Sequence, residues 1–309
     1  MLNGIINIYK EKGYTSHDVV AKLRGITKQK KIGHTGTLDP EATGVLPVCL
    51  GNATKLCDLF LSKEKEYIAT VQLGLSTDTQ DLTGKVLETR EVAITLQQLE
   101  KVIEEFIGEY DQIPPMYSAL KVDGKKLYEL AREGKEIERK PRRVTIYELE
   151  LLEAELPLFS IRVRCSKGTY IRTLCHDMGI RLGTLAAMKE LERTKSGPFR
   201  LDAALKLEEV QQMMEEYQAT DRKETPGFLF PVDFFFEDCS SLRLQKEYEK
   251  LVYNGNPFME HQLKKEFQKK ERKDKEKYRV YAEGKKLLGV YEYKKEEGRF
   301  CPYKMFLEK

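Results

Sequence analysis

The residues best suited to chemistry surround a single carboxylate, Asp39, in a loop of small residues. Glycines stand at positions 33, 36 and 44, and a residue without a side chain allows backbone geometries and close ligand approaches that other residues obstruct. Pro40 restricts Asp39 toward an extended conformation. The pattern predicts a carboxylate aimed at a ligand, although a tight turn in which Asp39 only accepts hydrogen bonds from nearby amides also fits.

Length and charge constrain what this loop could serve. A chain of 309 residues predicts one large domain plus a smaller module. The net charge is only +3, so affinity for a polyanion would have to come from local patches. Residues 22–31 carry five Lys or Arg and no acid, and residues 121–143 carry nine against five acids. Each patch could be a solvated face, but together they could line an RNA groove whose affinity falls with salt.

The cysteines and the amino terminus favour a cytoplasmic protein without a bound metal. Six cysteines are scattered, with no Cys-x-x-Cys pair and no Cys/His spacing typical of zinc. Cys49 and Cys165 lie in apolar runs and are expected in the core. The sequence begins without a signal-peptide pattern and contains no run of about 20 apolar residues that could span a membrane.

The elements expected to position the loop alternate between strands and helices, which predicts a mixed α/β (α+β) fold. Strands are predicted from the period-2 pattern, and helices from apolar residues at helical spacing. Ser16 and Thr169 are the expected N-caps of two helices. The predicted strands are Ile5–Tyr9, Tyr67–Leu75 and Phe159–Cys165, and the predicted helices start at Ser16, span Thr95–Phe106 and span Tyr170–Arg181.

The last of these helices is expected to bury one stripe and to present Arg172 beside it. Ile171, Leu174, Cys175 and Met178 recur at helical spacing and predict the buried stripe. Arg172 then lies on a neighbouring face of the first turn, near the end of the preceding strand. Because a cation at a helix start is unfavourable to the helix dipole, a specific role for this arginine is slightly favoured over a surface one.

The character of the chain changes after residue 236, where we place a domain boundary. Residues 237–309 contain a turn at Asn254–Pro257, a charge-dense stretch from Lys264 to Arg279, and two alternating segments, Tyr278–Ala282 and Leu287–Tyr293. Short strands with Gly turns predict a small β-barrel-like module. The expected domains are therefore residues 1–236 and 237–309.

Five segments carry a family resemblance. Residues 33–56 read GHTGTLDPEATGVLPVCLGNATKL, followed by KEY at 65–67, TDT at 77–79, MYSALK at 116–121 and GTYIRTL at 168–174. In content and order they resemble the TruB family, the bacterial tRNA pseudouridine-55 synthases, over most of residues 1–235. The resemblance implies a catalytic domain built on a mainly antiparallel sheet with flanking helices, followed by a β-rich PUA-like domain that binds RNA.

The reaction that the resemblance implies is the isomerisation of uridine 55 in the T-loop of tRNA to pseudouridine. The bond from uracil N1 to the ribose breaks, the base rotates, and C5 joins the same sugar carbon. Nothing is added or removed, so no cofactor or metal is expected. The expected partner is the tRNA T-arm stem-loop, and a cytoplasmic monomer without guide RNA, protein partner or membrane is the simplest expectation.

The resemblance also implies site residues. The catalytic set is Asp39, Arg172 and Tyr67: Asp39 acts on the ribosyl-uracil unit, Arg172 keeps Asp39 ionised and oriented, and Tyr67 stacks on the uracil. A guanidinium suits this role because it stays protonated and binds a carboxylate through two hydrogen bonds. A buried carboxyl needs such a partner because burial raises its pKa.

Further positions are implied to bind substrate. His34 would stack against RNA bases while the target is extruded, which costs a few kcal/mol, although it could simply bond its own loop. Lys10 matches an amino-terminal lysine of the family, but Glu11 follows where the family usually has Pro. Asp78 matches a position near the target, and turn-making is an equal alternative. Gly36, Thr37 and Leu38 complete the substrate-binding set.

Two other functional classes compete with a tRNA uridine isomerase. One is an RNA-binding or tRNA-folding protein whose catalysis is secondary, because gripping the T-arm and flipping a base would itself remodel tRNA. The other is an unrelated Asp-dependent hydrolase. A glycoside hydrolase would need a second carboxylate across the bond, and Glu41 is the only near candidate; its place directly after Pro40 argues against that reading.

Overall fold

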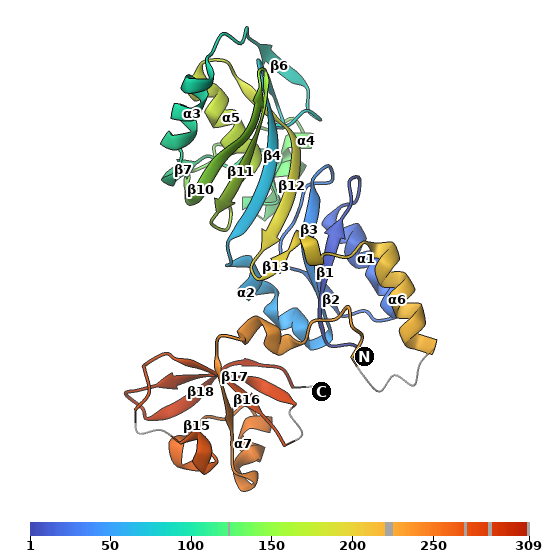
Figure 1. Cartoon of the computed structure of the whole chain (residues 1–309), viewed down its shortest axis with the longest axis vertical. Helices are drawn as coiled ribbons and strands as arrows, with labels where there is room; N and C mark the ends of the chain where they lie inside the picture. The colour runs from blue at the N-terminus through green and yellow to red at the C-terminus, as the bar shows by residue number, and fades with distance from the viewer. Residues whose placement is uncertain (123, 220–224, 269–270, 284–285, 308–309) are drawn as a thin grey trace.

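The computed structural model describes residues 1–122, 124–219, 225–268, 271–283 and 286–307. A large α/β body occupies most of the chain, and a smaller β-rich domain lies at one end of it (Figure 1). The mixed α/β prediction is thereby confirmed. No helix in the described ranges is long and apolar enough to cross a membrane.

The large body is organised around a nine-stranded sheet. Its main path runs β1-β3-β12-β4-β11-β10-β7, with β2 paired to β3 and β13 paired to β12. All pairs are antiparallel except β3 with β12. The strands are β1 (Gly4–Lys10), β2 (Ile32–His34), β3 (Thr43–Leu50), β4 (Lys65–Leu73), β7 (Gly108–Gln112), β10 (Arg142–Glu155), β11 (Leu158–Cys165), β12 (Ala186–Ser196) and β13 (Phe199–Arg200).

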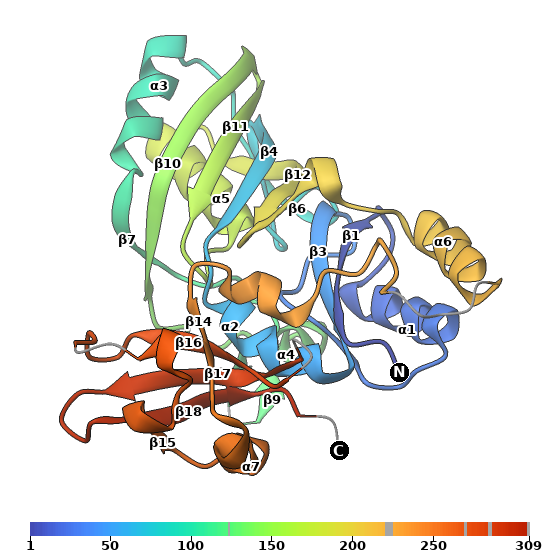
Figure 2. The same cartoon turned by 60° about the horizontal axis from the view of Figure 1, so that its bottom comes forward.

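Helices cover this sheet in two places. α3 (Leu96–Glu105) and α5 (Ile171–Leu182) pack on one face of β4, β10, β11 and β12, and their apolar residues share one core with those strands (Figures 1 and 2). α1 (Ser16–Thr27) and α6 (Leu207–Ala219) pack together against β1 and β3 in a second core. The Asp39 loop lies where these two halves meet: its Leu38 and Ala42 pack in the core of α3 and α5, and the Leu38 amide donates a hydrogen bond to Ser16 of α1.

The predicted elements are largely confirmed, and the two predicted N-caps are each wrong by one residue. Thr15 caps α1, with its hydroxyl accepting from the Asp18 amide in a capping box. Ser16 is the first helical residue, and its hydroxyl is used elsewhere. Tyr170 is the N-cap of α5, since the Thr169 hydroxyl donates back to the Ser166 carbonyl, 2.9 Å away. The stripe predicted for α5 is buried, and so are Cys49 and Cys165.

Short elements fill the connections of the large body. α2 follows a 3-10 turn after β3 and leads into β4, while two hairpins and a short helix separate the longer strands. These elements are η1 (Gly51–Leu56), α2 (Cys57–Leu61), β5 (Leu75–Thr77), β6 (Val86–Thr89), β8 (Lys121–Val122), β9 (Lys125–Lys126), α4 (Leu127–Arg132), η2 (Leu201–Ala203) and η3 (Val232–Phe236).

The carboxy-terminal domain is a five-stranded sheet in the order β14-β16-β17-β18-β15. The two alternating segments predicted from the sequence form β16 and β17. Phe236 and Phe306 join its β17 to the base of the large body in one apolar cluster. Residues 269 and 270 of the charge-dense stretch lie outside the described ranges. The remaining elements are β14 (Ser240–Arg243), η4 (Lys246–Tyr248), α7 (Glu249–Tyr253), β15 (Phe258–Met259), η5 (Glu260–Gln262), η6 (Lys265–Phe267), β16 (Lys277–Tyr281), β17 (Leu287–Lys294) and β18 (Arg299–Met305).

Candidate active site

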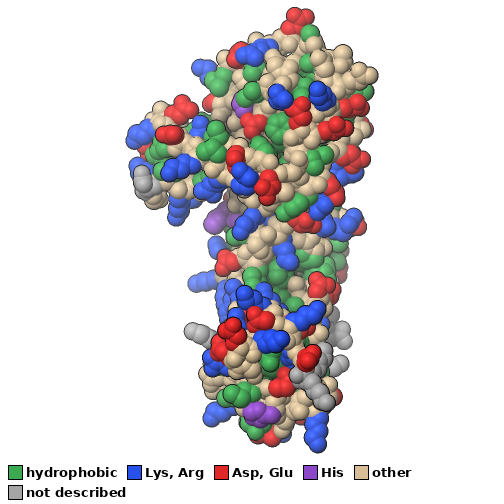
Figure 3. Space-filling model, turned by 90° about the vertical axis from the view of Figure 1, so that its left-hand side faces the viewer, with side chains coloured by type: hydrophobic (Ala, Val, Ile, Leu, Met, Phe, Trp, Pro, Cys, Tyr) green, Lys and Arg blue, Asp and Glu red, His purple; other side chains and the backbone are tan. Residues whose placement is uncertain are grey.

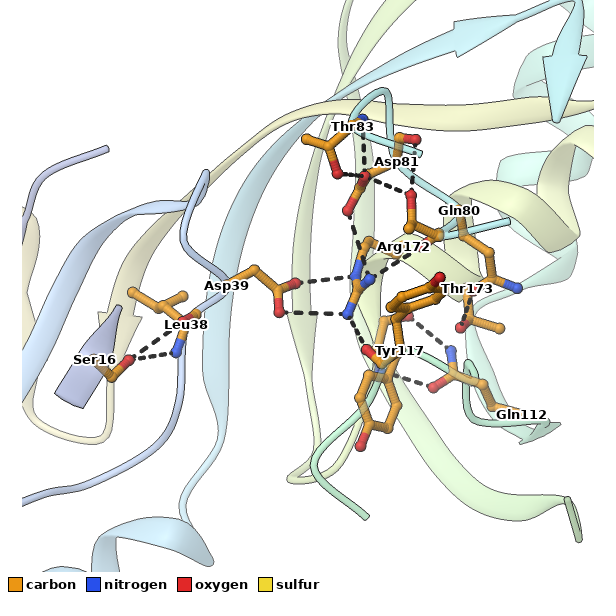
Figure 4. Close-up of polar contacts among 12 residues, drawn as sticks. Ser16, Leu38, Asp39, Gln80, Asp81, Thr83, Gln112, Tyr117, Arg172 and Thr173 are labelled. Carbon is orange, nitrogen blue, oxygen red and sulfur yellow. Dashed lines mark hydrogen bonds and ion pairs between the residues drawn. The ribbon is translucent and has the colours of Figure 1, made fainter. Parts of the chain in front are cut away.

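Asp39 lies in the loop that joins β2 to β3, and neighbouring groups fix the backbone on both sides of it. The Leu38 amide donates to the Ser16 hydroxyl at 2.9 Å, and that hydroxyl in turn lies 3.3 Å from the Leu38 carbonyl (Figure 4). The Ala42 amide donates to the Asp39 carbonyl. The Asp39 side chain keeps 40% of its surface exposed. Asp39 is therefore held by its backbone but remains open to a substrate.

Arg172, in the first turn of α5, meets this carboxylate in a bidentate pair. Its Nε lies 3.0 Å from Asp39 Oδ2, and its Nη2 lies 3.3 Å from Oδ1. Figure 4 shows the two side chains pointing toward each other from separate elements. The Arg172 side chain is only 7% exposed. This geometry is the fork that a guanidinium offers to a carboxylate, and it fixes the direction in which Asp39 points.

The rest of the Arg172 guanidinium is also fully engaged. Nη1 donates to the Thr79 carbonyl at 3.0 Å, and Nη2 donates to the Tyr117 carbonyl at 2.9 Å. A second carboxylate, Asp81, lies 3.5 Å from Nη1. Asp81 is itself held by the Thr79 and Thr83 hydroxyls. Arg172 thus joins three chain segments around Asp39, and a lysine could not reproduce these contacts.

The charge of Asp39 results from opposing effects. Burial raises the pKa of the Asp39 carboxyl above its ordinary value, and Asp81 raises it further. The Arg172 guanidinium and, to a smaller extent, the Lys10 ammonium lower it. A carboxylate whose ionisation depends on a nearby cation is a common feature of catalytic sites.

Tyr67 lies beside the loop on β4. It is 9% exposed and packs in the same core cluster as Leu38 and Ala42, the loop residues on either side of Asp39. Burial raises the pKa of the Tyr67 hydroxyl, whereas the charge of Arg193 and a hydrogen bond from it act in the opposite direction. Tyr67 and Asp39 are thus close enough for the charge of Asp39 to raise the pKa of the Tyr67 hydroxyl.

Lys10 lies beneath the loop rather than at its surface. It is fully buried, and its Nζ donates to three backbone carbonyls, including the Pro40 carbonyl at 3.0 Å. Burial lowers the pKa of Lys10 to about 8, although Asp39 raises it. All three ammonium hydrogens have acceptors, so Lys10 is arranged to support the residue that follows Asp39.

The remaining predicted positions surround this centre at different depths. His34 is half-buried at the end of β2, its Nδ1 accepts weakly from the Gly36 amide, and burial lowers the pKa of its imidazole. Thr37 is exposed, while Gly36 is buried. Asp78 accepts from the Lys85 amide at 2.7 Å, as its turn-making alternative predicts. Glu41 is exposed and pairs with Lys12.

Sequence reasoning missed two site residues, Asp81 and Arg193. Asp81 stands three positions after Asp78 in a turn-rich stretch, and an acid amid Thr residues gives no local sign that it will face an arginine. Arg193 lies in a strand of mixed charges, LERTKS, where an exposed face is the ordinary expectation. Only its position in the middle of the sheet reveals that it is buried.

Lys and Arg side chains gather on one face of the molecule (Figure 3). In Figure 3 the visible face is hollowed below a projecting lobe, and Lys and Arg side chains are frequent around the hollow and over the carboxy-terminal domain. Part of the second patch is the β8–β9 hairpin with α4, where Tyr128 lies between Lys126 and Arg132. Residue 123 of this patch lies outside the described ranges.

Comparison with known proteins identifies relatives over nearly the whole length. Residues 24–171 match the family model described as TruB family pseudouridylate synthase (N terminal domain), and residues 172–237 match that of the tRNA pseudouridylate synthase B C-terminal domain. A tRNA pseudouridine synthase B from Lachnoclostridium phytofermentans is 50% identical, covering 99% of this chain and 100% of the relative. The enzyme of the same name from Staphylococcus aureus (strain JH9) is 46% identical over 84% and 86%.

Solved structures give the same picture of the fold. An H/ACA RNP bound to a substrate RNA containing 2'-deoxyuridine has a chain with a TM-score of 0.72 and 25% identity, covering 99% of this chain and 85% of that one. A Cbf5-Nop10-Gar1 complex has a chain with a TM-score of 0.73 and 27% identity, covering 98% and 85%.

Proposed function

Because the chain belongs to the TruB family of pseudouridylate synthases, we propose that it converts uridine 55 in the T-loop of tRNA to pseudouridine, with Asp39 as the acting carboxylate. Its activity class is that of an RNA uridine isomerase that modifies tRNA. The role of Asp39 is supported by its bidentate pair with Arg172. This pair holds an accessible carboxylate ionised and aimed, as the reaction requires.

Asp39 acts on the ribosyl-uracil unit in one of two ways. It either adds covalently or removes a sugar proton while uracil departs. In both cases the bond from N1 to the sugar carbon breaks, C5 bonds to that carbon, and the C5 proton is released while N1 gains one. In the first route the bond from Asp39 to the nucleoside breaks again as the product forms, and in the second Asp39 returns the proton to the sugar. Since no atom is gained overall, the residues around Asp39 need only supply charge, orientation and proton transfer.

Access to the target requires base flipping. A uridine stacked in a folded tRNA loop cannot reach a carboxylate in this loop, and extrusion costs a few kcal/mol, which stacking and hydrogen bonds must offset. We assign the stacking on the target uracil to Tyr67, and the contact with the RNA bases left behind to His34. Gly36, Thr37 and Leu38 provide the backbone near the flipped nucleotide, while Lys10 supports the loop from below.

We assign RNA binding to the basic surfaces. The patches at residues 22–31 and 121–143 would neutralise phosphates of the T-arm, and residues 237–309 would act as a PUA-like RNA-binding domain beside the catalytic domain of residues 1–236. Binding through phosphates releases counterions, so affinity should fall steeply with salt. The chain is expected to work as a monomer without guide RNA or protein partner.

The test is tritium release from tRNA that carries 5-tritiated uridine, using the purified chain without added metal or guide RNA. Release is expected from tRNA with uridine at position 55, and none from tRNA in which that uridine is replaced by cytidine. Asp39→Ala should abolish release. Glu41→Ala is the matched control, because Glu41 is an exposed acid two residues away that pairs with Lys12. Full activity of the Asp39→Ala enzyme would refute the assignment.

A further inference from the structure

Arg193 is a buried cation that has no role in the reaction described above. It lies in β12, is 1% exposed, and ranks among the largest fully buried side chains of the described residues. No carboxylate lies within ion-pair distance of it in the described ranges. Burial lowers the pKa of its guanidinium. Taking such a charge out of water costs several kcal/mol when no counter-ion is present, so its contacts should matter to the site.

Its contacts span the loop that carries Asp39. Nε donates to the Val45 carbonyl at 2.6 Å, and Nη2 donates to the Gly36 carbonyl at 3.2 Å. These two carbonyls stand on opposite sides of Asp39 in sequence. One planar group therefore holds the two ends of the loop at a fixed separation, while Arg172 holds the carboxylate in the middle.

The third contact of Arg193 is Tyr67. The two residues are directly paired across the antiparallel strands β12 and β4, so their side chains lie beside each other on one face of the sheet. The charge of Arg193 and a hydrogen bond from it lower the pKa of the Tyr67 hydroxyl. A guanidinium has no acceptor, so the phenolic oxygen must be the acceptor in this bond.

We propose that Arg193 is a positioning residue that keeps the Asp39 loop and the ring of Tyr67 in one relative position, so that the carboxylate faces the sugar of the base stacked on that ring. The inference rests on the proposed function, because it takes Tyr67 to contact the target base. Arg193 and Tyr67 are paired across β12 and β4, so the guanidinium lies beside the phenol. The same guanidinium holds Gly36 and Val45, so the loop with Asp39 and the ring of Tyr67 keep one relative position.

The test is a double-mutant cycle that compares single-turnover rates of tritium release. Arg193→Met should lower the rate about 10- to 100-fold, the range for losing a hydrogen bond from a charged group. In a Tyr67→Phe background, which lacks the hydroxyl, the same change should cost a smaller factor, because only the contacts with Gly36 and Val45 remain to be lost. Arg162→Met is the matched control, since Arg162 is exposed on the sheet and pairs with Glu150; it should leave the rate unchanged.

Two outcomes would overturn the proposal. One is an Arg193→Met enzyme with the unsubstituted rate, and the other is an equal fold-loss with and without the Tyr67 hydroxyl, which would mean that Arg193 serves the loop alone. If Arg193→Met does not fold, Arg193→Lys decides by the same cycle. If the rate of the Tyr67→Phe enzyme is undetectable, the same cycle is carried out in an Asp39→Asn background, and the affinity for T-arm RNA is compared instead of the rate. Failure of the proposed function would differ, because the unsubstituted chain would then release no tritium.

Discussion

Replacing Arg172 by Met should make the activity depend on pH in a new way. The change removes a positive charge whose Nε lies 3.0 Å from Asp39 Oδ2. Two unit charges at about that distance attract by roughly 5 kcal/mol at an effective dielectric constant of about 20. Because the Asp39 side chain is 40% exposed, solvent screening reduces this to roughly 2 kcal/mol. The loss should raise the pKa of Asp39 in the variant, because the cation that lowers it is gone.

The sign of the effect follows from which form of Asp39 reacts. The carboxylate is the active form, so activity is lost as the pH falls through the pKa of Asp39. Burial already raises this pKa and Arg172 opposes the rise. In the Arg172→Met enzyme, the acid limb of the pH–rate profile should therefore move to higher pH. Single-turnover tritium release measured from pH 5.5 to about 9 would show partial recovery as the pH rises.

A lysine variant separates charge from geometry. Arg172→Lys keeps a cation near Asp39, so its acid limb should move little. Its rate should still fall at every pH, because one ammonium cannot serve Asp39 together with the carbonyls of Thr79 and Tyr117. An Arg172→Met enzyme whose acid limb stays in place would refute the electrostatic reasoning, and an Arg172→Lys enzyme of full activity would refute the geometric reasoning.

Three further predictions concern the supports of the site. Gly44→Ala should lower the free energy of unfolding by roughly 3 kcal/mol or more, measured in denaturant. Gly44 has a φ of +102°, and an added Cβ would meet the backbone of β12. Gly25→Ala is the control: Gly25 lies in open space within α1, so the change should raise the free energy of unfolding by about 0.5–1 kcal/mol. Lys10→Met should lower both stability and single-turnover rate, because the Pro40 carbonyl loses its donor. Burial raises the pKa of Asp177 to about 6, so the free energy of unfolding should fall as the pH rises from about 4 to about 6. Asp177→Asn should raise the free energy of unfolding by roughly 1–2 kcal/mol at pH 7.5, where the buried carboxylate is charged, but by little at pH 4.

Each of these predictions has a contrary result. Equal stability of the two alanine variants would contradict the close approach at Gly44. An unchanged rate for Lys10→Met would show that the loop does not depend on this lysine. A gain from Asp177→Asn that is the same at both pH values would mean that the buried charge is not its source.

The local sequence determined the elements and the loop chemistry. Alternating residues predict β4 and β11, helical spacing predicts α3 and the buried stripe of α5, and a glycine-rich loop around an acid predicts an aimed Asp39. These signals are local because a strand or a helix turn repeats within a few residues. The cap positions are less well determined, since Thr15 and Ser16 are both good caps and only the second hydroxyl is needed by Leu38.

Tertiary structure alone decided which charges meet. Asp39 and Arg172 are 133 residues apart, and a family resemblance, rather than any spacing, links them in the sequence. Asp81 reaches Arg172 because a hairpin turn lies over the start of α5, and Arg193 reaches Tyr67 because two strands pair in one register. Register and helix docking depend on packing over the whole core, so residue types near each position cannot reveal these contacts.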